Sequence, residues 1–159
     1  MANYDFEDKE AFTVVGVGVE LTSDYHDQAG LDKEKEDFFT RVTADGTVDK
    51  LREIAKNDFL FVVNHATDEK MMHYVGVLSD EKLPGASDSI PFPGGKYIAV
   101  PGEDESAYAL ADQLTKKTFG EVLATEQKFA YVGGPNAAVI MGEADGTFVG
   151  EMWIPVVEQ

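Results

Sequence analysis

The sequence contains no cysteine, which excludes disulfide bonds, thiolate metal sites and cysteine nucleophiles together. It is also poor in basic residues: 13 lysines and arginines stand against 30 acidic residues, so the formal net charge is −17. An acidic surface repels phosphate groups, and no basic patch interrupts it. We therefore expect no direct binding to nucleic acid or to an anionic membrane, whereas the field favours the approach of cations.

Long apolar runs are absent as well. A membrane-spanning helix needs about 18 consecutive apolar residues, and the chain has no such stretch. Its N-terminal segment carries acids in place of the apolar core of a secretory signal, so we expect a cytoplasmic protein. A length of 159 residues suits a single domain, 1–159, with a hydrophobic core of its own.

The first half of the chain alternates between β-branched and amphipathic segments. The patterns predict a strand at 11–21, a helix after Gly30, a short second helix that ends near Asn57, and a hairpin of strands at 58–65 and 71–78. Residues 80–95 are dense in proline and glycine, which is typical of a linker.

Beyond this linker the pattern restarts. We expect a strand at 96–100, a helix over about 104–123 and strands at 129–132, 137–141 and 147–157. The order β-α-β-β thus occurs twice, in halves at about 11–80 and 95–157. This predicts an α+β fold of two pseudo-symmetric β-α-β-β units with antiparallel sheets, which meet along their uncovered faces around a central ligand cleft.

The last predicted strand carries an acid in an otherwise apolar run. Glu151 precedes Trp153, the one tryptophan of the chain, by two residues. Successive side chains of a strand point to opposite faces, so the two side chains share a face. A desolvated carboxylate beside an indole suits a cation. The alternative is an exposed edge strand whose glutamate faces water.

Four segments in order along the chain resemble those of the GyrI-like small-molecule-binding domains, also called AraC-type or bacterial transcription activator effector-binding domains. They are Met71-Met-His-Tyr-Val-Gly76, Ile90-Pro-Phe-Pro-Gly-Gly-Lys-Tyr97, Phe119-Gly-Glu-Val-Leu123 and Glu151-Met-Trp-Ile-Pro-Val156. The resemblance runs from about Phe12 to Val157. It implies two pseudo-symmetric units around a cleft in which a glutamate of the last strand and several aromatic residues receive hydrophobic, often cationic molecules.

The resemblance assigns the acid of this cleft to Glu151 and its aromatic walls to Tyr74 and Trp153. By alternation Met72 shares a face with Tyr74, and its thioether suits an adaptable pocket wall. Tyr97 either lines the cleft or belongs to the core with its hydroxyl at the edge. These five residues form the predicted ligand site.

Two departures from the family pattern concern the walls of the cleft. Val122 stands where relatives commonly carry a tryptophan, and the segment Asn136-Ala-Ala-Val-Ile-Met141 lacks their usual acid and tyrosine. We therefore do not transfer a ligand identity.

Three functions remain open. Relatives of this type are often fused to a helix-turn-helix module, but this chain is expected to be a stand-alone module that captures a hydrophobic or cationic small molecule without a cofactor. The second function is that of a hydrolase of cyclopropane-type genotoxins, with Glu151 activating water and Tyr74 donating to the developing oxyanion. The third is an acidic interaction protein for a basic partner. We favour the first, and therefore lean away from an enzyme.

We expect no metal site. His65 and His73 fall on adjacent predicted strands, but a metal would also need Asp68 or Glu69 to converge on them, and no recognised ligand spacing is present.

Overall fold

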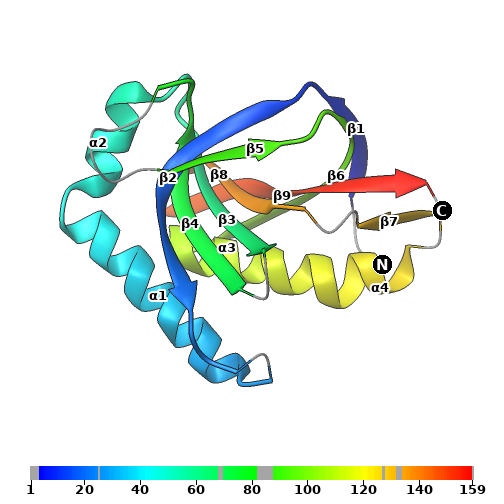
Figure 1. The fold of residues 1–159 in the computed structure, drawn as a ribbon, viewed down its shortest axis with the longest axis horizontal. Coiled ribbons are helices and arrows are strands. Elements are labelled where there is room, and N and C mark those ends of the chain that lie inside the picture. Colours follow the sequence, from blue (N-terminus) through cyan, green and yellow to red (C-terminus); the bar gives the residue numbers. More distant parts are fainter. Residues whose placement is uncertain are drawn as a thin grey trace.

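The computed structural model describes residues 4–24, 26–67, 70–81, 88–126, 128–131 and 134–158. The first half contains β1 (Asp5–Lys9), β2 (Phe12–Leu21), α1 (Gln28–Ala44), α2 (Thr47–Ile54), β3 (Leu60–Thr67) and β4 (Lys70–Leu78). The second half contains β5 (Asp88–Phe92), β6 (Gly95–Asp104), α3 (Ala107–Lys117), the π-helical turn η1 (Thr118–Val122), α4 (Leu123–Thr125), β7 (Phe129–Tyr131), β8 (Asn136–Ala144) and β9 (Thr147–Glu158) (Figure 1).

One antiparallel sheet runs through the whole molecule. Its strand order is β1-β6-β9-β8-β3-β4-β2-β5, and the short β7 pairs with the end of β9. The two halves join edge to edge through β3 and β8, in a register that runs from Leu60 opposite Ile140 to Asn64 opposite Asn136. The predicted α+β fold is confirmed. The halves were expected to meet along their uncovered faces; the structure also joins them through a shared ladder of hydrogen bonds, which makes their sheets continuous.

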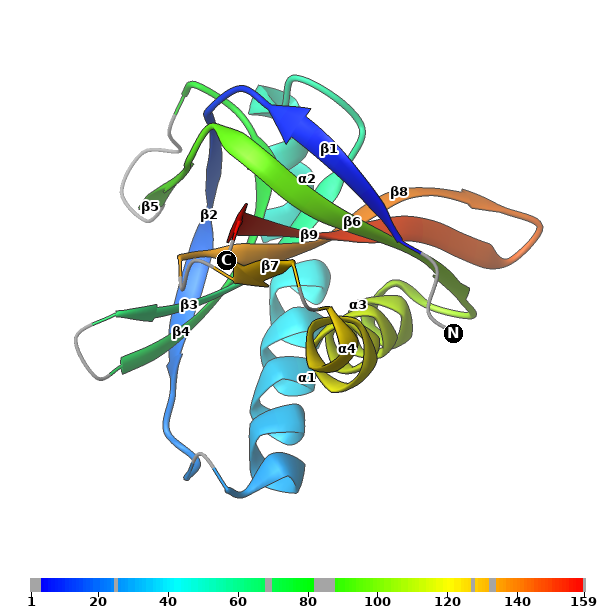
Figure 2. The ribbon, with the colours of Figure 1, turned by 90° about the vertical axis from the view of Figure 1, so that its right-hand side faces the viewer.

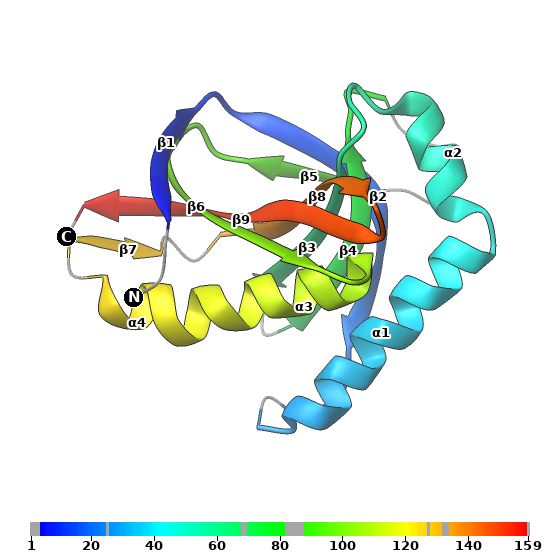
Figure 3. The same cartoon turned by 180° about the vertical axis from the view of Figure 1, so that it is seen from behind.

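The helices cover one face of this sheet. α1 and α3 lie on the same side of it (Figures 1 and 3). Apolar residues at helical spacing, such as Phe38 of α1, Leu51 of α2 and Leu114 of α3, pack against Met152 and Ile154 of β9 in one buried cluster. No helix of the described residues is both long and apolar enough to cross a membrane.

The other face curls upon itself (Figure 2). Phe12 of β2 stacks on Phe92 of β5, with ring centroids 4.7 Å apart, and also approaches Tyr97 of β6 and Trp153 of β9 at 6.0 Å each. Strands that are distant in the sheet order therefore touch through their aromatic side chains. This second cluster, which also includes Phe61, fills the inside of the curl.

Two strands were not predicted. β1 has the mainly charged sequence Asp-Phe-Glu-Asp-Lys and lies at one end of the sheet, where charged side chains protect an exposed edge. β5 falls in the predicted linker and contains Pro91, which is tolerated because β5 lies at the other end. The rest of the predicted breaker segment, 82–87, lies outside the described residues, as do 68–69 of the hairpin turn.

Candidate functional site

A cleft of about 430 Å³ lies between α1 and α3 on the helix-covered side of the sheet. Leu31 and Lys35 of α1 form one wall, and Thr115, Lys116 and Phe119 form the other. The strands contribute residues at or near their ends, among them Leu21, Asn64, Met71, Met72 and Asn136. Its volume falls in the range of small-molecule sites.

Most of the cleft surface is apolar. Leu31, Met71, Met72 and Phe119 supply side chains without charge, and the ring of Phe119 is 39% exposed at the π-helical turn. π-Helical turns often occur at functional sites. Flexible methionines beside an exposed aromatic ring can adapt to ligands of different shape.

A buried polar pair lies on the sheet at the inner side of the cleft. His73 of β4 is 1% exposed, and its Nδ1 lies 2.8 Å from Oδ1 of Asn64 on β3. A carbonyl oxygen only accepts, so Nδ1 carries the proton and donates it. Nε2 of His73 is then an acceptor, and it has no hydrogen-bond partner among the described residues.

Burial keeps this imidazole neutral. Desolvation, together with the nearby charge of Lys35, lowers the pKa of His73 from 6.5 to about 3. His73 therefore contributes a hydrogen-bond acceptor, and no positive charge, at neutral pH.

A second cavity, a small chamber of about 10 Å³, adjoins the cleft. Lys35, Asn64 and Thr115 line both spaces. The chamber is also lined by Val62, His73, Tyr108, Ala111 and Asp112, which do not line the cleft. This volume suits about one water molecule or one oxygen atom of a ligand.

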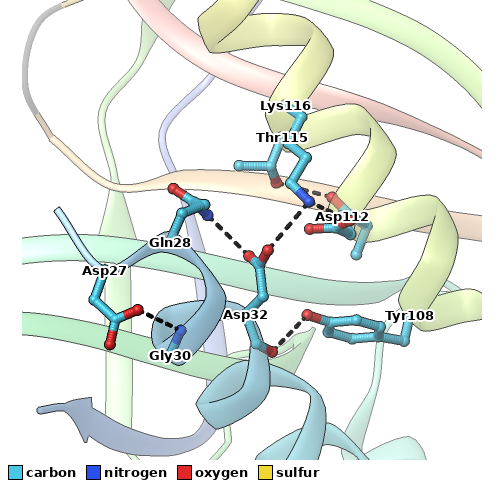
Figure 4. A network of polar contacts seen from close by, with 9 residues as sticks. Asp27, Gln28, Gly30, Asp32, Tyr108, Asp112, Thr115 and Lys116 are labelled. Atoms are coloured by element: carbon cyan, nitrogen blue, oxygen red, sulfur yellow. Dashed lines mark hydrogen bonds and ion pairs between the residues drawn. The ribbon is translucent and has the colours of Figure 1, made fainter. Parts of the chain in front are cut away.

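A polar network fixes α1 against α3 at this place (Figure 4). Nζ of Lys116 lies 3.2 Å from Asp32 on α1 and 3.0 Å from Asp112 on α3. The hydroxyl of Tyr108 donates to the backbone carbonyl of Asp32 at 3.0 Å, and Gln28 donates to its carboxylate at 2.9 Å. Burial raises the pKa of Tyr108 well above its usual value, so the hydroxyl remains a donor.

Glu151 and Trp153 lie on the opposite face of the sheet, since Met152 and Ile154 between and beside them point to the helices. The indole N–H of Trp153 donates to Glu151 at 2.8 Å. Nζ of Lys9 lies 3.8 Å from the centroid of the Trp153 ring and 3.0 Å from Glu7. The acid and the indole are thus together, as predicted, and the cation over the indole is the chain's own Lys9.

The other predicted site residues are divided between the two faces. Met72 lines the cleft. Tyr97 is fully buried in the aromatic cluster, where its hydroxyl donates to the carbonyl of Pro93 at 2.7 Å, and half-buried Tyr74 packs against the same cluster. Within the described part of the chain, no hydrogen bond joins Tyr74 to Glu151. The ligand-binding roles of these residues stay predictions.

The two departures from the family pattern fall in different places. Asn136 lines the cleft, whereas Val122 is fully buried in the helix-side core. Within the described ranges, which omit Asp68 and Glu69, no cluster of three or more His, Asp or Glu residues could hold a metal ion.

Sequence reasoning missed Lys35 of α1. A signal was present: Leu31, Lys35, Phe38 and Val42 follow helical spacing, and the other three side chains are buried. A lysine on the buried stripe of an amphipathic helix is a candidate for a partly desolvated functional group.

With this geometry in view, comparison with known proteins identifies the type of molecule. Residues 6–156 match the family model Cass2, described as integron-associated effector binding protein. No match was found among curated proteins. The family match covers almost the whole chain and confirms the resemblance to GyrI-like effector-binding domains.

Solved structures agree in fold. The protein SAV2435, solved with tetraphenylphosphonium bound, superposes with a TM-score of 0.79 at 17% identity, covering 98% of this chain and 94% of that one. A protein described as a bacterial transcription regulation protein, from Staphylococcus aureus MU50, gives 0.76 at 16% identity, with 98% and 99% covered. An integron cassette protein from the mobile metagenome of Vibrio cholerae gives 0.57 at 13% identity, with 96% and 95% covered. At these identities the likeness concerns the fold alone.

The buried imidazole predicts a pH-dependent stability. Between the folded pKa of His73, about 3, and its ordinary value of 6.5, the unfolded chain binds a proton that the folded chain does not. The contribution of neutral His73 to the free energy of unfolding is therefore fully present above about pH 6.5. It decreases as the pH is lowered, by about 1.4 kcal/mol per pH unit at most. We expect His73→Gln to flatten this slope between about pH 6.5 and pH 5 in urea unfolding.

At about pH 8 His73 is neutral in both the folded and the unfolded chain, so the difference in the free energy of unfolding between the two proteins measures only the change in packing. This difference is subtracted from the values at lower pH. Parallel pH profiles for the wild type and His73→Gln would contradict a neutral His73 in the folded state.

Proposed function

Because this chain belongs to the family of integron-associated effector binding proteins, we propose that it binds a hydrophobic small molecule in the cleft between α1 and α3. The observation that carries the proposal is the cleft itself: about 430 Å³, mainly apolar walls and a few convergent polar groups on its inner side. That combination is the usual character of a small-molecule site.

The walls of the cleft are suited to holding a ligand in place. The network of Lys116, Asp32 and Tyr108 ties α1 to α3, so the cleft between them is largely preformed. A preformed site loses less conformational entropy on binding than one that must be assembled. Exposed Phe119, at one side of the cleft, offers a ring face to an entering ligand.

A cationic ligand has a second candidate position. The carboxylate of Glu151 and the ring of Trp153 form an acid–aromatic pair of the kind that attracts lipophilic cations, and the relative SAV2435 was solved with the cation tetraphenylphosphonium. The net charge of −17 supports the approach of cations. At this position a ligand would replace the ammonium group of Lys9 over the indole.

Binding is the function that the geometry supports best. The hydrolase alternative requires Glu151 and Tyr74 to act on one substrate, but among the described residues Glu151 accepts from Trp153 and forms no hydrogen bond with Tyr74. Each binding position makes a separate prediction.

For the cleft, we expect a neutral fluorescent dye such as N-phenyl-1-naphthylamine to bind with increased emission. Phe119→Ala should weaken this binding about tenfold, because it removes ring surface that the ligand covers. Phe6→Ala is the matched control, since Phe6 is 41% exposed and Phe119 39%, but Phe6 lies on β1 away from the cleft. Equal effects of the two substitutions would contradict the proposal.

For the strand β9 position, titration calorimetry with tetraphenylphosphonium is the test. If cations bind at Glu151, the variant Glu151→Gln should lose roughly tenfold or more in affinity for this cation and keep its affinity for the neutral dye. Unchanged affinity for tetraphenylphosphonium would remove Glu151 from ligand recognition.

A further inference from the structure

The charge of the cleft differs from that of the protein as a whole. Among the described residues, which omit Asp68 and Glu69, the lining of the cleft includes Lys35 and Lys116 and no aspartate or glutamate. This holds in a chain whose formal net charge is −17. A lining without carboxylates lacks the group that a lipophilic cation would need there.

The two lysines differ in their partners. Lys116 is held between Asp32 and Asp112 at 3.2 and 3.0 Å, and these bonds raise its pKa. Lys35, in contrast, takes part in none of the ion pairs within 4 Å that the described residues form. Its half-buried side chain lines both the cleft and the chamber.

The surroundings of Lys35 disfavour an unpaired ammonium. Desolvation lowers the pKa of Lys35, although the charges of Asp32 and Asp112 act in the opposite direction. Those two carboxylates are bonded to Lys116 (Figure 4). A buried ammonium without a direct counter-ion gains when a ligand supplies one.

The neighbours of Lys35 leave room for a ligand oxygen. Asn64 accepts from His73, so its amide nitrogen is still a donor, and His73 is neutral. The chamber beside them has about the volume of one water molecule, and its lining also includes Asp112, whose carboxylate is bonded to Lys116. The ammonium group of Lys35 and the amide nitrogen of Asn64 are thus two donors on the lining of the cleft, where a negatively charged oxygen would contact them.

We propose that the cleft recognises amphipathic carboxylates, with the carboxylate on Lys35 at the inner end and the apolar body against Leu31, Met71 and Phe119. This inference rests on the proposed function, namely that the cleft is the ligand site, and adds the ligand class. The overall negative charge slows the approach of such anions, but salt screens it beyond about 8 Å, whereas the contact with Lys35 is direct and partly desolvated.

Three probes with the same ten-carbon chain test the ligand class: decanoate, decanol and decylammonium. In displacement of the neutral dye from the wild type, we expect decanoate to bind at least tenfold more tightly than decylammonium, with decanol between them. Tightest binding by decylammonium would overturn the inference.

Lys35→Met tests the residue, because methionine keeps an unbranched side chain and removes the charge. We expect decanoate to lose about tenfold in affinity, and decylammonium to bind equally or more tightly. Lys33→Met is the matched control: Lys33 lies on the same helix, is exposed and pairs with Asp37, so its loss should change neither ligand. An unchanged preference in Lys35→Met would also overturn the inference.

The outcomes separate this inference from the proposed function. If neither the dye nor any of the three probes binds, the cleft is not a ligand site and both proposals fail. If the dye and decanol bind in a manner that depends on Phe119 but decanoate has no advantage, only the preference for carboxylates fails.

Discussion

The pairing of β3 with β8 is the constraint on which the rest of the structure depends. It joins the two β-α-β-β halves edge to edge, so both carry their helices on the same face of one sheet. α1 and α3 therefore face each other across the seam, and the cleft lies between them. Asn64 and Asn136, the last residue pair of this ladder, both line the cleft. The inner polar wall of the site is thus built from the same contact that unites the halves.

Strand alternation divides the chemistry of the molecule between two faces. On β9, Met152 and Ile154 enter the core under the helices, while Glu151 and Trp153 join the aromatic side of the curled sheet. There the carboxylate accepts from the indole and Lys9 lies over the ring, so the acid, the aromatic ring and a cation are already assembled within the chain. On the helix side, Lys35 lines a mainly apolar cleft and forms no direct ion pair within the described part of the chain. The two proposed ligand positions thus differ in charge: a carboxylate, Glu151, on one face and an ammonium group, Lys35, on the other.

Local patterns predicted most elements, because helices such as α1 and strands such as β3 have the residue spacing and composition of their own secondary structure. β1 and β5 were not predicted. The charged segment of β1 and the proline-containing segment of β5 become strands only because distant partners, β6 and β2 respectively, supply the hydrogen bonds. The joining of the two half-sheets through β3 and β8 was not predicted either, because no local pattern specifies which edges of two half-sheets pair. Lys35 was missed for a related reason. A lysine in a charged segment such as α1 is expected to be solvated, and only the packing of a second helix beside it removes it from water.

Nuclear magnetic resonance can test the central claim in one sample, with ¹³C-labelled methionine methyl groups and the ¹⁵N-labelled indole of Trp153. Met71 and Met72 line the cleft, whereas Trp153 lies on the opposite face of the sheet. Saturation with N-phenyl-1-naphthylamine should shift the methyl signals of Met71 and Met72 through the ring currents of the dye, and leave the Trp153 indole signal in place. A shift of the Trp153 indole without a change at Met71 and Met72 would contradict a ligand site between α1 and α3.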